Sequence, residues 1–315
     1  MTGVSGPAVT GRATVISTVA NLKRINPKGP DHVESHAVTE PNIVPDDVDL
    51  AASLPYFYRD ESRYVPTEIT RGGWGPSISG HVVGGLLGWA VERAVDDVQL
   101  QPARLTVDLP RPTALEPVEV HTRVHHDRRR LRLVEAVLIQ CGEPVARGSA
   151  LFLRRGPEPD GRVWSQPVQM PPLPIEQEGA HPALFMRTYG WGSEIQNPDP
   201  EWAHTSGPKY TWLHETRPLI DGEPLSAFTR AAMAADITAS IANWGTNALQ
   251  FINVDYTLTL SRLPEGTHLG LASLTHQSHE GVATGSAVLV DHVGPVGTCV
   301  SVAIAQPGFR PPSAG

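Results

Sequence analysis

The sequence contains few of the residues that build covalent or metal-linked frameworks. Only two cysteines occur in 315 residues, Cys141 and Cys299, and they form no Cys-x-x-Cys pair. We therefore expect neither a disulfide framework nor a cysteine-based zinc site. No apolar run reaches the roughly 18 residues that a membrane span requires, and the N-terminus lacks the charged-then-apolar pattern of a secretory signal. The expectation is a reduced, soluble, cytoplasmic protein.

Positive charge is also scarce. The chain has 25 Lys and Arg against 33 Asp and Glu, a formal net charge of −8, which does not indicate a phosphate-binding surface. The one basic run, Arg128–Arg132, predicts a solvated hairpin tip, with contact to the phosphates of a nucleotide-like ligand as the alternative. We expect no nucleic-acid partner.

The signatures of several enzyme classes are missing as well. The sequence has no GxSxG nucleophile elbow, no GxxxxGK[ST] phosphate loop and no GxGxxG after a strand. The segment HVESH at 32–36 is not the zinc-binding HExxH pattern. His121, His125 and His126 fall on a predicted strand and its turn, where we expect them to be exposed. We expect no metal and no cofactor.

Composition divides the chain into two structured blocks. Apolar residues make up 40% and charged residues 18%, which is typical of a folded protein. Glycine, proline and polar residues dominate at 1–50, predicting a flexible arm, and at 156–205, predicting a linker. The predicted blocks are 51–155 and 206–306, followed by a tail at 307–315.

Both blocks follow one order: an extended segment, a long helix, then a run of antiparallel strands. The segment GPSISGHVVGGLLGWAVERAVDDV predicts the first helix, because its apolar residues recur at helical spacing. The segment PLSAFTRAAMAADITASIANWG predicts the second. A single apolar helix can bury its face only against such a sheet.

The two blocks also share a constant offset. Residues at matching places in helix, strand and hairpin are 151 positions apart, which indicates an internal duplication that forms a pseudo-dimer. The matching pairs are Gly85 with Asp236, Arg111 with Arg262, and Pro144 with Pro295.

One residue breaks the apolar character of the second helix. Asp236 lies in AAMAADITASIANWG (231–245), which contains no Lys or Arg. Burial of a lone carboxylate is costly. Since Gly85 takes the equivalent place in the first block, we expect one asymmetric site. A structural acid, bonded to a hydroxyl or a backbone N–H, is the other interpretation.

Six short motifs resemble the TesB-like acyl-CoA thioesterase family, whose members have the double hotdog fold. This α+β fold has two tandem hotdog repeats, each a long helix wrapped by an antiparallel sheet. The motifs in the first repeat are SGHVVGGLLGWAVERA (79–94), LTVDLPRP (105–112) and VARGSALFL (145–153). Those in the second are MAADITAS (233–240), INVDYTLTLSR (252–262) and GPVGTCVSVAI (294–304).

The resemblance implies hydrolysis of an acyl-CoA thioester at three residues. The family aspartate corresponds to Asp236, the family threonine to Asn253 and the family glutamine to Ser301. The last two are departures that weaken the expectation of efficient hydrolysis. Asn253 still donates and accepts hydrogen bonds, whereas Ser301 is too short to reach as far as glutamine. The family also implies that chains can pair as homo-oligomers.

The chemistry of these residues fits that reaction. A desolvated carboxylate has a raised pKa and can activate water. Asn253 and Ser301 could hold that water or fix the orientation of the carboxylate. N–H groups at the start of the first helix, with His81, can stabilise an oxyanion. Gly84 and Gly85 are expected to let the thioester approach closely. Ordinary structural roles for His81, Asn253 and Ser301 stay open.

Two other functions remain. The alternative to a hydrolase is a non-hydrolytic acyl-CoA or acyl-carrier binding protein on the same scaffold. The changes at Asn253 and Ser301 favour this alternative. An enoyl-CoA hydratase-like protein is a weaker alternative, because the Asp-x-Asn-Pro-x-His-like segment of the hotdog hydratases is missing. The acyl chain length cannot be inferred from the sequence.

Overall fold

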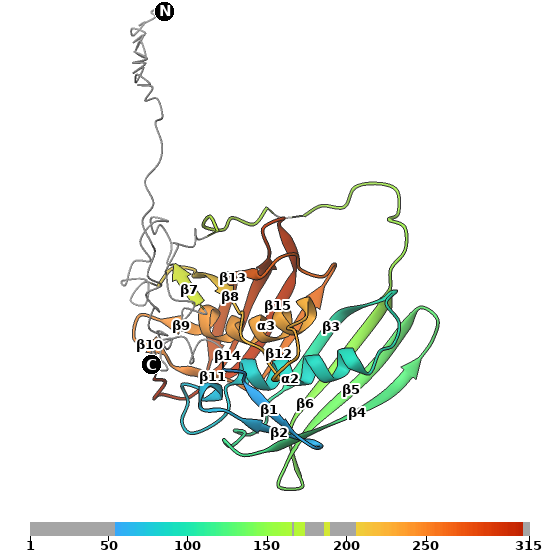
Figure 1. Cartoon of the computed structure of the whole chain (residues 1–315). Coiled ribbons are helices and arrows are strands. Elements are labelled where there is room, and N and C mark those ends of the chain that lie inside the picture. Colours follow the sequence, from blue (N-terminus) through green and yellow to red (C-terminus); the bar gives the residue numbers. More distant parts are fainter. Residues whose placement is uncertain (1–53, 166, 174–185, 190–205, 311–315) are drawn as a thin grey trace, which may run out of the picture. The chain divides into compact units, whose positions relative to one another are not determined.

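The computed structural model of the chain describes residues 54–165, 167–173, 186–189 and 206–310 (Figure 1). The predicted arm at 1–50 lies outside these residues, as do 166, 174–185 and 190–205 of the linker predicted at 156–205. The helices are η1 (Glu68–Thr70), α2 (Gly80–Arg93) and α3 (Ala227–Asn243). The strands of the first half are β1 (Phe57–Asp60), β2 (Arg63–Pro66), β3 (Leu100–Asp108), β4 (Val118–Asp127), β5 (Leu131–Gln140) and β6 (Glu143–Arg154). The remaining strands are β7 (Met186–Tyr189), β8 (Tyr210–His214), β9 (Trp244–Gly245), β10 (Ala248–Leu249), β11 (Phe251–Asn253), β12 (Asp255–Leu260), β13 (His268–His279), β14 (Val282–Val290) and β15 (Pro295–Ala305).

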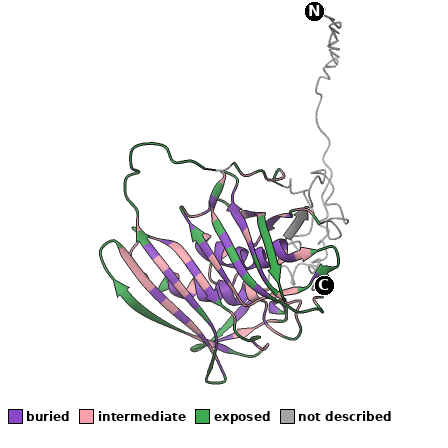
Figure 2. Cartoon of the chain, turned by 180° about the vertical axis from the view of Figure 1, so that it is seen from behind, coloured by how far each residue is buried: buried purple, intermediate pink, exposed green. Residues whose placement is uncertain are grey.

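One sheet joins both halves of the described chain. Its strand order is β1-β2-β4-β5-β6-β3-β12-β15-β14-β13-β8-β7, with β11 also paired to β15, while β9 and β10 form a separate hairpin. Helices α2 and α3 lie against each other on one face of this sheet (Figure 1). Buried and exposed residues alternate along the strands (Figure 2), as expected where one face packs on helices and the other meets solvent. This is the predicted double hotdog fold.

The centre of the sheet shows how the two repeats are related. Strand β3 pairs with β12, and Thr106 stands opposite Thr257 in that register. Their hydroxyl oxygens are 3.0 Å apart, and the two residues are separated by 151 positions. Equivalent residues of the two repeats therefore meet at this pair, which marks the axis of the pseudo-dimer.

The helices are shorter than the segments that predicted them. Helix α2 begins after Ser79, whose side chain makes no capping hydrogen bond. Helix α3 is capped by Ser226, whose side chain accepts a hydrogen bond from the Thr229 N–H at 2.9 Å. The apolar residues that predicted α2 are all buried: Val82, Val83, Leu86, Leu87 and Val91. Helix α3 is rich in alanine, so it approaches the sheet and α2 closely.

Part of the predicted linker packs on the second repeat. Val168 and Met170 contact Trp212, whose indole N–H donates to the Pro171 carbonyl at 2.9 Å. Strand β7 also falls within the predicted linker and pairs with β8. The segment 157–164, in contrast, is exposed.

Two smaller predictions, both about exposed residues, are confirmed. Arg128–Arg132 spans the turn between β4 and β5, and residues 128–130 are exposed. The three strand histidines, His121, His125 and His126, are exposed too. Within the described part of the chain no helix is long and apolar enough to span a membrane.

Candidate active site

Asp236 is buried in the middle of α3, with 8% of its surface exposed. The Asn253 side-chain amide donates a hydrogen bond to its Oδ1 atom at 2.9 Å. Asn253 is the last residue of β11 and stands opposite Ala303, which is buried. This register turns the amide toward α3, so the structure brings two of the three predicted polar residues together.

Burial changes the acid–base behaviour of this carboxylate. It raises the pKa of Asp236 from 3.8 to about 6, and the hydrogen bond from Asn253 offsets part of that increase. A carboxylate with this pKa is mostly ionised at neutral pH yet accepts a proton more readily than an exposed aspartate. These are the properties of a general base.

The start of α2 lies directly beside the carboxylate. A Cβ atom placed on Gly80 would be 2.6 Å from Oδ1 of Asp236, which leaves no space for any side chain at position 80. The first repeat therefore places the N-terminus of α2 beside the Asp236 carboxylate, which belongs to the second repeat. The Gly80 N–H is one of those that an α-helix leaves without an intrahelical acceptor, and the helix dipole favours negative charge here. Sequence analysis missed Gly80, although it directly precedes the predicted His81.

His81 is a neutral group in this position. Burial, and secondarily the positive charge of Arg217, lowers the pKa of His81 to about 4. The Ser79 hydroxyl lies 2.7 Å from Nδ1, and the Tyr56 ring meets the imidazole edge-on at 5.7 Å between centroids. The imidazole is held beside the first turn of α2, where it can donate a hydrogen bond without carrying charge.

A buried acid, Glu215, is connected to His81 through Tyr56, whose ring contacts the imidazole. Glu215 accepts hydrogen bonds from the Tyr56 hydroxyl at 2.7 Å and from the Arg217 backbone N–H at 2.9 Å. Burial raises the pKa of Glu215, and these hydrogen bonds limit the increase. This cluster could not be identified from the sequence, because Tyr56 precedes β1 whereas Glu215 and Arg217 follow β8.

Gly84 and Gly85 serve packing, which corrects the role expected for them. A Cβ on Gly84 would lie 1.8 Å from the Tyr256 hydroxyl oxygen, and one on Gly85 would lie 2.5 Å from Cγ of Met233. Their sites are therefore filled by side chains of the second repeat, with no room for substrate. Both N–H groups also lie beyond the first turn, where α-helical bonds occupy them.

Tyr256 occupies the contact between the two helices. It is fully buried, and its hydroxyl donates to the Ala232 carbonyl of α3 at 2.8 Å. Burial raises the pKa of Tyr256, and the nearby Asp236 charge raises it further. The residue holds α2, α3 and β12 in register around the site. It escaped sequence analysis, since one tyrosine on a strand has no distinctive pattern.

Ser301 lies on the same face of the sheet but is not bonded to Asp236. It is 2% exposed, and its hydroxyl has no hydrogen-bond partner within the described residues. It stands two positions before Ala303 on β15, so its side chain points to the same side as Asn253. The structure thus assembles Asp236, Asn253 and the start of α2, with Ser301 nearby as an unused polar group.

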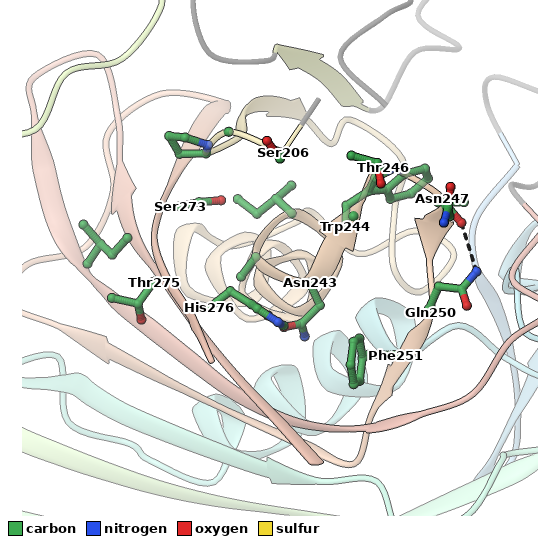
Figure 3. Close-up of a pocket in the computed structure, with 17 residues that line it drawn as sticks. Ser206, Asn243, Trp244, Thr246, Asn247, Gln250, Phe251, Ser273, Thr275 and His276 are labelled. Atoms are coloured by element: carbon green, nitrogen blue, oxygen red, sulfur yellow. Dashed lines mark hydrogen bonds between the residues drawn. The ribbon is translucent and has the colours of Figure 1, made fainter. Parts of the chain in front are cut away.

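A pocket of about 630 Å³ opens at the C-terminal end of α3 (Figure 3). It is lined by the last residues of α3, the β9–β10 hairpin, Phe251 of β11 and Ser273–His276 of β13. Among the described residues no three His, Cys, Asp or Glu side chains are grouped as ligands for a metal ion.

Comparison with known proteins gives two matches to domain families. Residues 70–153 match the acyl-CoA thioesterase N-terminal domain, and residues 167–305 match the acyl-CoA thioesterase C-terminal domain. Together the two matches cover most of the chain. No curated protein sequence matches it.

Solved structures with similar architecture share little sequence with the chain. The acyl-CoA thioesterase II TesB2 from Mycobacterium marinum is 16% identical, with a TM-score of 0.57, over 84% of this chain and 100% of that one. A putative thioesterase II from Thermobifida fusca is 18% identical, with a TM-score of 0.56 and the same coverage. A protein of unknown function with a hot dog fold from Alicyclobacillus acidocaldarius is 14% identical, with a TM-score of 0.58, over 84% and 99% of the two chains. At these identities the likeness shows the fold.

Proposed function

Because the chain belongs to the TesB-like acyl-CoA thioesterase family, we propose that it hydrolyses a fatty acyl-CoA thioester with water oriented by Asp236. The observation that carries this proposal is the buried carboxylate itself. It has a pKa of about 6, its orientation is set by Asn253, and it lies at the start of α2.

The reaction needs a base for water. Asn253 bonds to Oδ1 of Asp236, which leaves Oδ2 to accept a proton from water. The water oxygen then attacks the thioester carbonyl carbon, and the proton moves to the carboxylate. When the tetrahedral intermediate collapses, the carbon–sulfur bond breaks, and Asp236 returns its proton to the leaving thiolate. The products are a free fatty acid and CoA.

The intermediate carries negative charge on the former carbonyl oxygen. The Gly80 N–H and the positive end of the α2 dipole are suited to stabilise that charge. The neutral His81 ring, beside the same turn, is suited to donate a further hydrogen bond. Negative charge at Asp236 and at the oxyanion would repel each other if they coexisted, but the carboxylate is protonated when the oxyanion forms.

A second candidate function rests on Ser301. Its buried hydroxyl makes no hydrogen bond within the described residues, so the third polar group of the family site does not support Asp236. An acyl-CoA or acyl-carrier binding protein without turnover would need no such support. The same chain would then bind acyl-CoA and release no product.

Release of free CoA from a panel of acyl-CoAs separates these functions. We expect turnover by the unaltered chain and a loss of at least about 100-fold in kcat for Asp236→Asn, since general-base catalysis typically contributes that much. The matched control is Asp255→Asn, because the Oδ1 atom of Asp255 only accepts the Val302 N–H, which asparagine can also do. If no acyl-CoA is hydrolysed but acyl-CoA raises the melting temperature, the binding function is correct.

A further inference from the structure

The pocket at the end of α3 combines aromatic and polar side chains. Phe251 and Trp244 contribute ring surfaces, and Ser273, Thr275 and His276 contribute hydrogen-bonding groups. Figure 3 shows Asn243 and His276 side by side below the end of the helix, with Phe251 next to Asn243. No Asp, Glu, Lys or Arg lines this pocket within the described part of the chain.

The pocket and the candidate active site are built from the same two elements, α3 and β11. Asn243 follows Asp236 by seven residues, which is about two helical turns and about 10 Å on the same face of α3. Phe251 precedes Asn253 by two residues on β11, so both side chains point to the same side. An acyl chain whose carbonyl lies at Asp236 and which follows α3 toward its C-terminus would end in this pocket.

Asn243 lines this pocket and has a hydrogen-bond donor that no described residue satisfies. The residue is 4% exposed, and its Oδ1 atom is 2.7 Å from Nδ1 of His276. Because the amide oxygen only accepts, His276 carries its hydrogen on Nδ1, and this bond fixes the orientation of the amide. The Nδ2 atom is buried and has no acceptor among the described residues. A buried donor without an acceptor is costly, which makes it a good partner for a ligand oxygen.

On the basis of the function proposed above, we propose that the pocket holds the distal end of the acyl chain and that Asn243 donates a hydrogen bond to a neutral oxygen there. The substrate class is an oxo- or hydroxyacyl-CoA. A distal carboxylate does not fit, since no described lysine or arginine lines the pocket to pair with it and burial of an unpaired charge is costly. A plain alkyl end would leave the Asn243 donor unsatisfied.

Matched pairs of acyl-CoAs test this assignment. Each pair has one plain chain and one chain of equal length with a keto group next to the terminal methyl, from butanoyl to dodecanoyl. The keto oxygen only accepts hydrogen bonds, so it needs the Asn243 donor. We expect the oxo substrate to be preferred by about tenfold in kcat/KM at the length that reaches Asn243, the value of one good hydrogen bond. Shorter chains should show no preference.

Asn243→Asp is the informative variant. It keeps an oxygen for His276 and replaces the Nδ2 donor by a second acceptor. The preference for the oxo substrate over the plain chain of equal length should disappear. Asn247→Asp is the control, because this residue lies at the exposed rim of the same pocket. It should retain the preference.

Affinity measurements separate this inference from the proposed hydrolysis. Calorimetric titration of the same pairs into Asp236→Asn should show the same tenfold difference in Kd. If no acyl-CoA is hydrolysed but this difference is found, the pocket assignment stands and the hydrolase proposal fails. If plain chains are hydrolysed and no length shows a preference, or if Asn243→Asp and Asn247→Asp behave alike, the pocket assignment is wrong. If nothing is hydrolysed or bound, both are wrong.

Discussion

At the scale of single residues, the carboxylate of Asp236 links function to pH. Its pKa is raised to about 6 by burial, and only the ionised form can take a proton from water. We expect kcat/KM to rise tenfold per pH unit below about pH 6 and to level off above it. Measurement of initial rates from pH 4.5 to 8 tests this. A rate that does not change between pH 5 and 7 would rule out Asp236 as the base.

The same residue should make the fold less stable at neutral pH. The folded pKa lies above the unfolded value, so the protonated form favours folding; this contribution is full below about pH 4 and is lost as pH rises through about 6. The difference between 3.8 and about 6 corresponds to about 3 kcal/mol. Asp236→Asn should therefore be more stable than the unaltered chain at pH 8, and the two should converge near pH 4. Urea unfolding at both pH values measures the difference in free energy of unfolding between the two proteins. If this difference is the same at pH 4 and pH 8, the raised pKa is not that of Asp236.

The site was only partly predictable at this scale. The apolar surroundings of Asp236 in the sequence marked it as unusual, and the family motif connected it to Asn253. Gly80 could not be identified, because its importance comes from an Asp236 atom that lies 156 positions away in the chain and 2.6 Å from where its Cβ would be. The role of Gly84 and Gly85 was predicted wrongly for the same reason: a sequence does not show which side chain fills the space beside a glycine.

At the scale of elements, the contact between α2 and α3 depends on glycine. Gly84→Ala would place a methyl group 1.8 Å from the Tyr256 hydroxyl oxygen and 2.8 Å from Cζ of the same ring. We expect a loss of about 2–3 kcal/mol in the free energy of unfolding, as is typical when a packed core is overfilled. Chemical denaturation measures it.

Two further variants make this prediction specific. Gly156→Ala introduces the same methyl group into open space and should change stability by less than about 0.5 kcal/mol. Tyr256→Phe combined with Gly84→Ala should recover part of the loss, because the nearest atom is removed. If the loss of stability in the double variant equals the sum of the losses in the two single variants, the clash with Tyr256 does not cause the effect of Gly84→Ala.

The strands show where sequence patterns stop being informative. The segment QFINVDYTLTLSR (250–262) predicts one strand, whereas the structure has β11 and β12 separated at Val254. There the Asp255 side chain accepts the Val302 N–H at 2.7 Å, and Val254 donates to the Val302 carbonyl. This bond between a side chain and the backbone of another strand interrupts the regular ladder. The hydrophobic periodicity of the sequence does not indicate this hydrogen bond.

At the scale of the whole molecule, the described structure is held together by contacts between repeats. Strand β3 pairs with β12, α2 packs on α3, and the candidate site takes Gly80 from one repeat and Asp236 from the other. These contacts do not depend on the covalent connection between the repeats. The duplication was predictable from the offset of 151 residues, which is the same in the helix, the strand and the final hairpin.

Cleavage of the connection should therefore leave activity intact. Val163 and Trp164 are 94% and 82% exposed, so a protease site inserted between them is accessible. After cleavage we expect both fragments to elute as one complex in gel filtration and to retain at least half of the thioester hydrolysis. The chain without the inserted site, treated with the same protease, is the control. Separation of the fragments without denaturant would show that the connection is essential.

The central pair of Thr106 and Thr257 has a consequence for stoichiometry. Rotation about that axis takes Asp236 to Gly85, Asn253 to Pro102 and Ser301 to Ala150, residues that are buried and without ionisable groups. Under the proposed function each chain therefore has one reactive centre and one counterpart without a carboxylate, and a tight inhibitor should saturate at one equivalent per chain.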